Sequence, residues 1–283
     1  MKDLGYYNGK YDLIENMTVP MNDRASWFGD GVYDVSVARN GIPHRFEYHI
    51  DRFFRSAEKI RIVMPVTKEE LKKITFDMMA KLDTDNVMIY WQVTRGYAPG
   101  YRAHAFDPSI PGNLWMTVKP CEIKRPEKTL RLISVEDTRY LLCDIKTINL
   151  LPNCLAEQAA KDVGCDTAVF HRGNTITECA HSNVHIIKGG KVITHPLDDK
   201  ILPGTVRANM LRLCDEIGVP TEEREFTMDE LMNADEVFTT STSALCMRVS
   251  EIDGKPVGMK DEKTFKAVQD ASYNDFFTFT DKK

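Results

Sequence analysis

Two β-hairpins in the second half of the chain constrain its fold more than any other feature of the sequence. The segments TAVFH (167–171) and TITEC (175–179) flank the turn residues RGN, while SNVHII (182–187) and KVITHP (191–196) flank KGG. Strand-forming residues on both sides of a short glycine-containing turn are typical of antiparallel strand pairs. The sequence therefore predicts sheet structure here.

Helical segments are interleaved with these strands. One is expected to open at Pro152 and stop at Gly164, because proline suits the first turn of a helix and glycine its end. Another is expected from Thr205 to Gly218. Its apolar stripe consists of Met210, Leu213, Cys214 and Ile217.

The first third of the chain also mixes helix and strand signals. Thr67 and Glu70 form a capping-box pattern ahead of LKKITFDMMAKL (71–82), where Leu71, Ile74 and Met78 share one helical face. A second helix is predicted over EYHIDRFFRSAEKI (47–60), with Ile50, Phe53, Phe54 and Ala57 at helical spacing. The segments 87–96 and 113–120 are rich in β-branched and aromatic residues and predict strands. An α+β domain is the expected result.

The length of 283 residues favours two domains. The segment KPCEIKRPEK near 119–128 is polar, contains two prolines and shows neither period, so we expect it to be a linker. The expected domains are 1–118, an N-terminal α+β domain, and 129–283, which carries Lys146.

The composition indicates a soluble globular protein of the cytoplasm. Hydrophobic residues make up 42% of the chain and charged residues 28%, the formal net charge is −5, and neither a signal peptide nor a membrane-spanning segment is evident. Binding to nucleic acid or to an anionic membrane is therefore not expected. Seven scattered cysteines are expected to be reduced and mostly buried, at Cys121, Cys143, Cys154, Cys165, Cys179, Cys214 and Cys246.

No metal site is expected. Along an extended chain His181 and His185 would be separated by roughly 13 Å, which is too far for one ion.

Lys146 lies among mostly apolar neighbours in CDIKTINLL (143–151), and Glu178 follows in TITEC. Such a lysine is most often a surface residue whose stem covers a core edge. Burial also disfavours the ammonium form, however, and a neutral amine can react with an aldehyde. That alternative predicts pyridoxal phosphate chemistry.

Three segments could bind the anionic groups that such chemistry needs. Gly204 in ILPGTVR (201–207) precedes a helix, whose first N–H groups can receive a phosphate, and TTSTSA (239–244) and Arg52 offer hydroxyl and guanidinium donors. An ordinary loop, a polar strand end and a solvated arginine are the alternative explanations. Arg102 and His104 are candidates for binding a carboxylate, or are plain loop surface charges.

Seven segments, in order, resemble the class IV aminotransferases, and within that family the bacterial D-amino-acid enzymes. They are FGDGVYD (28–34), HIDRF (49–53), VTRGYAPGYRAH (93–104), CDIKTINLL (143–151), TITECAHSNV (175–184), ILPGTVR (201–207) and TTSTSA (239–244). The resemblance implies fold type IV of the pyridoxal-phosphate enzymes, with a smaller α+β N-terminal domain and a larger C-terminal domain built on an irregular β-barrel. It also implies a homodimer with the active site at the subunit interface.

The resemblance assigns roles to individual residues. Lys146 matches the lysine that holds pyridoxal 5'-phosphate and moves the substrate proton, and Glu178 matches the carboxylate facing the pyridine nitrogen. Further cofactor contacts are expected from Arg52, Leu202, Gly204, Thr205, Val206, Ser241 and Thr242.

Tyr33, Arg102 and His104 match the group that binds the substrate α-carboxylate in the D-amino-acid enzymes, where the Arg and His come from the other subunit. Several positions depart from the family pattern: Val206 replaces a threonine, Val37 a polar pocket residue, and Cys179, Ala180 and His181 smaller or hydroxyl residues near the active-site wall. Side-chain preference is therefore open.

The implied reaction moves the amino group of a D-amino acid, such as D-alanine, to a 2-oxo acid, such as 2-oxoglutarate, in a ping-pong cycle. The same fold also admits a branched-chain L-amino-acid or amine transaminase, or an aminodeoxychorismate lyase. A cofactor-binding module without turnover is disfavoured because Lys146 and Glu178 are both present.

Overall fold

The computed structural model describes residues 2–97 and 102–281. The chain divides into two compact units: unit 1 comprises Met1–Ile123, Ile145–Asn149 and Phe279–Lys283, and unit 2 comprises Lys124–Asp144 and Leu150–Thr278. The short segment that carries Lys146 thus groups with unit 1 rather than with the residues on either side of it.

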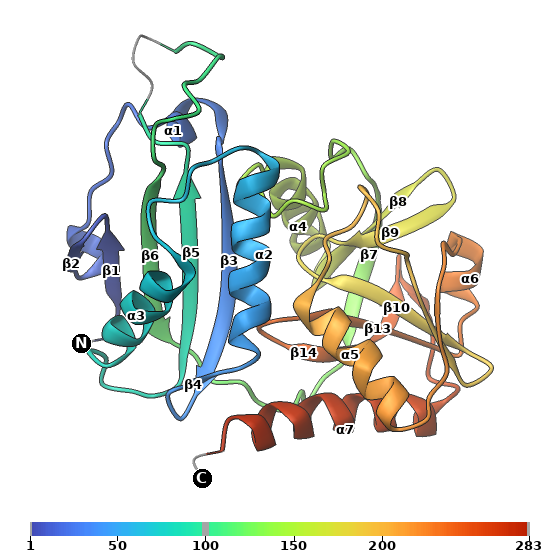
Figure 1. Cartoon of the computed structure of the whole chain (residues 1–283). Helices are drawn as coiled ribbons and strands as arrows, with labels where there is room; N and C mark the ends of the chain where they lie inside the picture. The colour runs from blue at the N-terminus through green and yellow to red at the C-terminus, as the bar shows by residue number, and fades with distance from the viewer. Residues whose placement is uncertain (1, 98–101, 282–283) are drawn as a thin grey trace. The chain divides into compact units, whose positions relative to one another are not determined.

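Unit 1 contains an antiparallel sheet, which has six strands in its described residues (Figure 1). The strand order is β2-β1-β6-β5-β3-β4. The strands are β1 (Leu4–Tyr7), β2 (Lys10–Asp12), β3 (Gly31–Arg39), β4 (Ile42–Pro43), β5 (Val87–Thr94) and β6 (Asn113–Pro120). The predicted strands at 87–96 and 113–120 are confirmed as β5 and β6.

Helices α2 (Phe46–Lys59) and α3 (Lys68–Met79) cover one face of this sheet (Figure 1). Both helices were predicted, and the capping box of Thr67 and Glu70 is formed at the start of α3. The core between them is apolar, and the buried indole of Trp91 donates a hydrogen bond of 3.0 Å to Thr75 Oγ1 on α3. Unit 1 also holds the short helices η1 (Ile14–Asn16) and α1 (Arg24–Phe28).

Unit 2 contains a mixed sheet with nine strands in its described residues, in the order β12-β11-β10-β13-β14-β7-β8-β9, with β15 paired to β14. The sheet curls into a half-barrel, and both predicted hairpins are confirmed, as β8–β9 and β10–β11. The strands are β7 (Leu130–Glu136), β8 (Thr167–Arg172), β9 (Thr175–Cys179), β10 (Asn183–Lys188), β11 (Lys191–Thr194), β12 (Thr221–Glu223), β13 (Glu236–Ser241), β14 (Leu245–Ile252) and β15 (Lys255–Pro256).

The helices of unit 2 are α4 (Leu151–Asp162), α5 (Thr205–Glu216), α6 (Met228–Met232) and α7 (Glu262–Phe279). The predicted helices at 152–164 and 205–218 are confirmed as α4 and α5. The prediction that Ile217 belongs to the apolar stripe of α5 was wrong. Ile217 follows the last residue of the helix and is 42% exposed, whereas Met210, Leu213 and Cys214 are buried. Helix α7 was not predicted.

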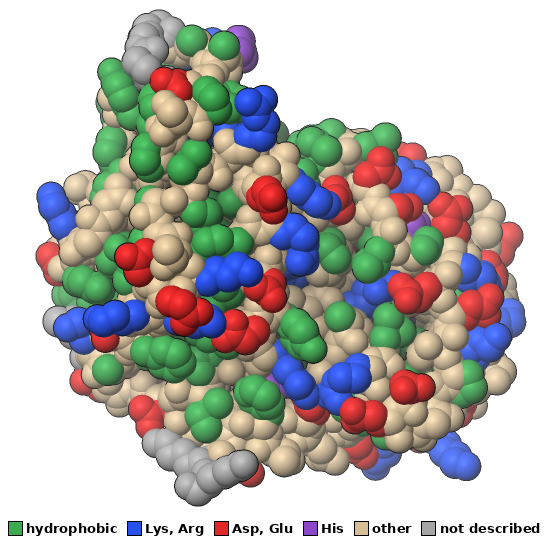
Figure 2. Space-filling view, viewed as in Figure 1, with side chains coloured by type: hydrophobic (Ala, Val, Ile, Leu, Met, Phe, Trp, Pro, Cys, Tyr) green, Lys and Arg blue, Asp and Glu red, His purple; other side chains and the backbone are tan. Residues whose placement is uncertain are grey.

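Positive and negative side chains are interspersed on the face drawn in Figure 2, and neither sign gathers there. Among the described residues, no helix has the length and apolar character needed to cross a bilayer. The described cysteines are free, but only Cys179, Cys214 and Cys246 are buried, so the expectation of mostly buried cysteines was wrong. Cys154 is exposed on α4.

Candidate active site

Lys146 lies against strand β3 of unit 1. Its carbonyl accepts a hydrogen bond of 2.9 Å from the backbone N–H of Tyr33, and the next residue, Thr147, forms a bridge with Val32. The Lys146 ammonium nitrogen lies 4.5 Å from the centre of the Tyr33 ring. The structure therefore brings together the predicted cofactor lysine and one predicted substrate residue.

Gly31 makes this approach feasible. A Cβ at Gly31 would lie 2.8 Å from the carbonyl oxygen of Val93 and 3.1 Å from the side chain of Ile148. Ile148 also donates its backbone N–H to the carbonyl of Gly31 at 3.1 Å. Gly31, the second glycine of the FGDGVYD segment, is thus needed for the segment that carries Lys146 to pack on β3.

Tyr33 is held by aromatic stacking. Its ring stacks on Tyr90 of β5 at 5.4 Å, and Tyr90 stacks in turn on Trp115 of β6 at 5.1 Å. The hydroxyl of Tyr90 donates to Gln92 Oε1 at 2.8 Å. Burial raises the pKa of Tyr90, so this phenol is a neutral donor.

Arg52 is buried on α2 in a forked ion pair with Asp34 of β3. Its Nε and one terminal nitrogen each donate to a different carboxylate oxygen at 2.8 Å, and His49 Nδ1 donates to the same carboxylate at 2.9 Å. Burial alone would raise the pKa of Asp34, but the charge and hydrogen bonds of Arg52 outweigh it and hold that pKa well below its usual range. Burial lowers the pKa of His49, so the imidazole is neutral near pH 7.

Arg102 and His104 lie together on the ring of Phe28. The His104 ring is 5.2 Å from that of Phe28, and the Arg102 guanidinium carbon is 5.8 Å from its centre. Arg24 secures the loop, because its guanidinium donates to the carbonyls of Ala103 at 2.7 Å and His104 at 2.9 Å. Arg102 and His104 are themselves exposed in the single chain.

Glu178 lies on β9 in unit 2 and is buried, with three donors on its carboxylate. Arg139 donates to Oε1 at 2.5 Å, while Asn183 Nδ2 at 3.0 Å and the backbone N–H of Leu202 at 3.1 Å donate to Oε2. These donors all favour the ionised carboxylate.

Arg139 was not found from the sequence, although it governs the charge of Glu178. Its guanidinium also makes a two-point pair with Asp137 at 2.9 Å and lies 4.6 Å from the ring centre of Phe170. Burial would lower the pKa of Arg139, but the hydrogen bonds that it donates to Asp137 and the charge of Glu178 raise it. A permanently charged arginine therefore faces the predicted cofactor carboxylate.

The predicted phosphate-binding turn begins α5. Gly204 is the N-cap residue of α5. The side chain of Asn183 occupies the space where a Cβ of residue 204 would lie, because that Cβ would be 2.0 Å from Asn183 Oδ1. Asn183 Nδ2 also donates to the carbonyl of Leu202 at 3.0 Å. Gly204 makes no side-chain capping hydrogen bond, and Thr205 and Val206 are the first residues of α5, the end of a helix that favours anions.

Strand pairing places Ser241 and Thr242 in the same region of unit 2 as Asn183 and the start of α5. Strand β10 pairs with β13 so that Asn183 lies opposite Thr240, the residue before Ser241. Both halves of the predicted anion cradle therefore flank Asn183. Arg52, the third predicted phosphate ligand, belongs to unit 1.

The departures from the family pattern lie in different surroundings. Cys179 and Ala180 are buried in apolar clusters of unit 2, and burial raises the pKa of the Cys179 thiol to about 12. His181 is exposed and pairs with Glu157 at 3.0 Å. Val37 and Val206 are both buried.

Comparison with known proteins places these residues in a family context. Residues 31–252 match the family model for amino-transferase class IV. The chain is 39% identical over 247 residues to the D-alanine aminotransferase of Listeria monocytogenes serovar 1/2a, with 86% of this chain and 85% of the relative covered. It is 37% identical over 256 residues to the D-alanine aminotransferase of Bacillus licheniformis, with 89% of each covered.

The fold is that of solved members. The branched-chain amino acid aminotransferase of Escherichia coli superposes with a TM-score of 0.89 at 22% identity, covering 100% of this chain and 97% of that chain.

Proposed function

The chain belongs to the class IV aminotransferases, and we propose that it transfers the amino group of a D-amino acid, such as D-alanine, to a 2-oxo acid, such as 2-oxoglutarate. It is a pyridoxal-phosphate-dependent transferase. The observation that carries the D-selectivity is the Arg102–His104 loop, held on Phe28, in a chain whose curated relatives are named D-alanine aminotransferases.

The residues present fit this cofactor. Gly204 leaves no room for a Cβ beside Asn183, α5 starts without a side-chain cap, and Arg139 holds Glu178 anionic. When bound, pyridoxal phosphate supplies an aldehyde and a ring that accepts electrons from the substrate α-carbon. The residues that would hold its phosphate are Arg52, the Gly204–Val206 turn, Ser241 and Thr242, and Leu202 would contact the ring.

Lys146 is the base that removes the proton from the substrate α-carbon. Its side-chain nitrogen Nζ lies 4.5 Å from the centre of the Tyr33 ring, so the side chain is held close to a predicted carboxylate-binding residue. Positioning of this kind is what lets one amine both hold the cofactor and move a proton.

Glu178 would accept a hydrogen bond from the ring nitrogen of the cofactor and would keep a proton on that nitrogen. Arg139 supports this role because it keeps the carboxylate ionised without donating a proton itself. Tyr33, Arg102 and His104 bind the substrate α-carboxylate, which presents the α-hydrogen of the D-enantiomer to Lys146.

The proposed assembly is a homodimer in the cytoplasm, in which each active site receives Arg102 and His104 from the partner subunit. Their exposure in the single chain suits residues that act on a neighbouring subunit. The proposed domains are 1–118 and 129–283, joined by the linker at 119–128, although the segments Ile145–Asn149 and Phe279–Lys283 group with compact unit 1.

The test is a half-reaction screen that follows the absorbance of the bound cofactor after adding D- or L-amino acids, followed by pyruvate formation from D-alanine and 2-oxoglutarate. We expect D-alanine to react and L-leucine to be slow. Conversion of L-amino acids alone would support a branched-chain enzyme instead, and pyruvate release from aminodeoxychorismate without an acceptor would support a lyase. Borohydride trapping with peptide mass analysis should place the cofactor on Lys146.

A further inference from the structure

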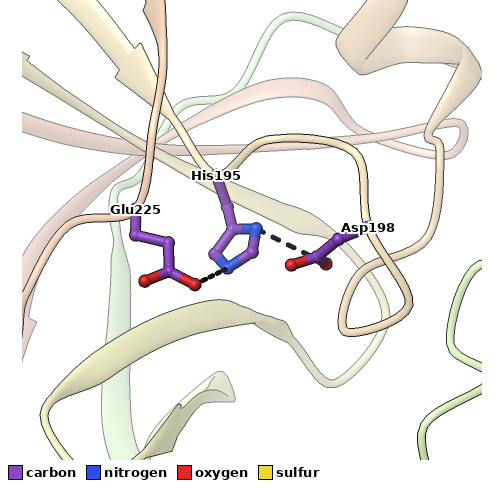
Figure 3. A group of neighbouring side chains, drawn as sticks. All are labelled: His195, Asp198 and Glu225. Carbon is purple, nitrogen blue, oxygen red and sulfur yellow. Dashed lines mark ion pairs between the residues drawn. The ribbon is translucent and has the colours of Figure 1, made fainter.

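A histidine and two carboxylates converge in unit 2 where two parallel strands end. Strands β11 and β12 pair in parallel, with Thr194 opposite Glu223, so the residues that follow them emerge at the same edge of the sheet. His195 directly follows β11, and Glu225 lies two residues after β12. The turn after His195 brings back Asp198, whose Oδ1 lies 3.8 Å from His195 Nδ1, while Glu225 lies on the Nε2 side of the ring (Figure 3).

The tautomer of His195 follows from its contacts. Nδ1 lies 2.9 Å from the carbonyl oxygen of Pro196, and because a carbonyl can only accept, Nδ1 carries the proton. In the neutral imidazole Nε2 is then a lone-pair acceptor. This nitrogen lies 3.9 Å from Glu225 Oε1, also an acceptor (Figure 3).

Nε2 of His195 is one of few buried side-chain atoms without a hydrogen-bond partner in the part of the chain that the structure describes. His195 itself is only 1% exposed, so bulk water does not solvate the ring. A buried acceptor facing a carboxylate oxygen is unfavourable unless a proton or a cation lies between them. Lys200 supplies a positive charge to the two carboxylates, but Nε2 itself has no hydrogen-bond partner in the described residues.

The donor set has the composition and spacing of a metal site. One donor atom each from His195, Asp198 and Glu225 lies within 4.8 Å of the others, and within the described residues this is the group with that property. Zn²⁺ forms bonds of about 2.0–2.2 Å, so two donors at a tetrahedral angle lie about 3.4 Å apart and the 3.9 Å gap must close by about 0.5 Å. Donation of the other ring N–H to a backbone carbonyl is common in metal-bound histidines.

Lys200 is the competing cation. Its ammonium nitrogen lies 2.7 Å from Glu225 Oε1 and 3.3 Å from Asp198 Oδ2, and the hydrogen bond to Glu225 raises the pKa of Lys200. The side chain is 31% exposed and can turn into solvent. The other neighbouring cations, Arg207 and Arg224, donate to the backbone carbonyls of His195 and Glu225 and pair with Glu223 and Glu230.

We propose that His195, Asp198 and Glu225 bind one divalent cation of the zinc class, displacing Lys200 from the two carboxylates. One imidazole with two carboxylates favours Zn²⁺ or a similar transition ion over Mg²⁺ or Ca²⁺, which prefer oxygen ligands alone. This proposal departs from the sequence-based expectation of no metal, which considered histidines alone as ligands. Arg139, which donates to Glu178, also donates to the backbone carbonyl of Lys200 at 3.1 Å. This hydrogen bond connects the turn that carries Asp198 and Lys200 to the arginine beside Glu178.

The experiment is a calorimetric titration of the dialysed, cofactor-loaded full chain with Zn²⁺. We expect one equivalent to bind, and an anomalous scattering peak beside His195 in a Zn²⁺-soaked crystal. His195→Asn keeps a donor near Pro196 but lacks Nε2, and Glu225→Gln lacks the charge. Each should weaken binding at least about tenfold.

Lys200→Met tests the proposal without removing any of the three proposed metal-binding side chains. Removing the competing ammonium should tighten Zn²⁺ binding by about tenfold or more, because a like charge no longer lies near the ion. Lys191→Met is the matched control, since Lys191 pairs with Glu222 across the same two strands at 3.0 Å, and its Zn²⁺ affinity should equal that of the parent.

Three outcomes would overturn the proposal. They are an absence of stoichiometric Zn²⁺ binding, binding unaffected by both His195→Asn and Glu225→Gln, and equal affinities for Lys200→Met and Lys191→Met. Thermal unfolding of each variant shows whether it folds, and Lys200→Met keeps the test decisive if His195→Asn does not.

Discussion

At the scale of single residues, the charge of Glu178 is decided by its neighbours. A carboxylate in an apolar pocket would tend to take up a proton, but Arg139, Asn183 and the N–H of Leu202 all donate to it. Arg139 keeps its charge because a guanidinium holds its proton throughout the ordinary pH range, and Asp137 also pairs with it. These contacts within unit 2 favour the ionised form of Glu178.

Glu178→Gln should therefore cripple catalysis. The amide oxygen accepts from the donors on one side only, the NH2 faces donors on the other, and no charge remains to hold a proton on the ring nitrogen. We expect the rate of the D-alanine half-reaction to fall by at least about 10², and thermal unfolding checks that the variant is folded. Stopped-flow absorbance of the bound cofactor measures this rate. Glu136→Gln, at an exposed carboxylate on β7, is the control and should react as the parent does; equal rates for both variants would contradict the assigned role.

At the scale of elements, Asn183 links strand β10 to the start of helix α5. Its side chain contacts Glu178 and the Leu202 carbonyl, and it fills the space where Gly204 lacks a Cβ. The carboxylate on β9 and the helix N-terminus are thereby held by one amide. A substitution at Gly204 should therefore alter both the position of the Glu178 carboxylate and the N-terminus of α5.

Gly204→Ala tests this linkage. The new Cβ would overlap Asn183 Oδ1, so the free energy of unfolding should fall by about 1–3 kcal/mol and the cofactor should dissociate more readily. Gly190→Ala is the control, because Gly190 has a φ of +72° in an open turn. It should lower stability by about 1–2 kcal/mol through backbone strain and leave cofactor affinity unchanged. Denaturant unfolding and equilibrium dialysis separate the two effects, and equal cofactor loss in both variants would contradict the linkage.

At the scale of the whole molecule, each unit buries a neutral histidine. In unit 1 His49 is bonded to Asp34, and in unit 2 both ring nitrogens of His185 pair with the hydroxyls of Thr194 and Thr240 at 2.9 Å. Burial lowers the pKa of both histidines, and that of His185 lies well below its usual value. Acid should therefore weaken both units.

The sign follows from proton binding. Below about pH 6.5 the unfolded chain protonates these histidines while the folded chain does not, so stability is present above that pH and is lost as the pH falls towards the lowered pKa values. Denaturant unfolding between pH 8 and pH 5 should show this loss. In His185→Gln the free energy of unfolding should change less steeply with pH between pH 8 and pH 5. An unchanged pH dependence would exclude His185 as a cause of the loss of stability in acid.

Shared active sites give a second prediction at this scale. If Arg102 comes from the partner subunit, dimers mixed from Arg102→Ala and Lys146→Ala chains contain one complete site in each heterodimer, and co-refolding should restore about a quarter of the parent activity. Mixing Lys146→Ala with Glu178→Gln is the control and should restore nothing, since both residues serve the site of their own chain. Recovery in neither mixture would contradict a shared site.

Local patterns predicted those elements whose residues satisfy their own requirements. The hairpins have glycine in their turns, α3 has its capping box, and α2 and α5 have apolar stripes, so short-range forces suffice to indicate them. Helix α7 lacks so clear a pattern, and it was missed. Ile217 was misplaced because a helical stripe does not show where the last turn ends.

The sequence alone determined the family and the mixed α+β class, and it predicted Lys146, Glu178 and Gly204 as site residues, because motifs and local periodicity depend on neighbouring residues. Only the tertiary structure decided what surrounds them: Arg139 and Asn183 on Glu178, Asp34 on Arg52, Arg24 under the Arg102–His104 loop, and Glu225 facing His195. The physical reason is that hydrogen bonds and ion pairs act over a few ångströms in space. Strand pairing sets which distant residues come within that range.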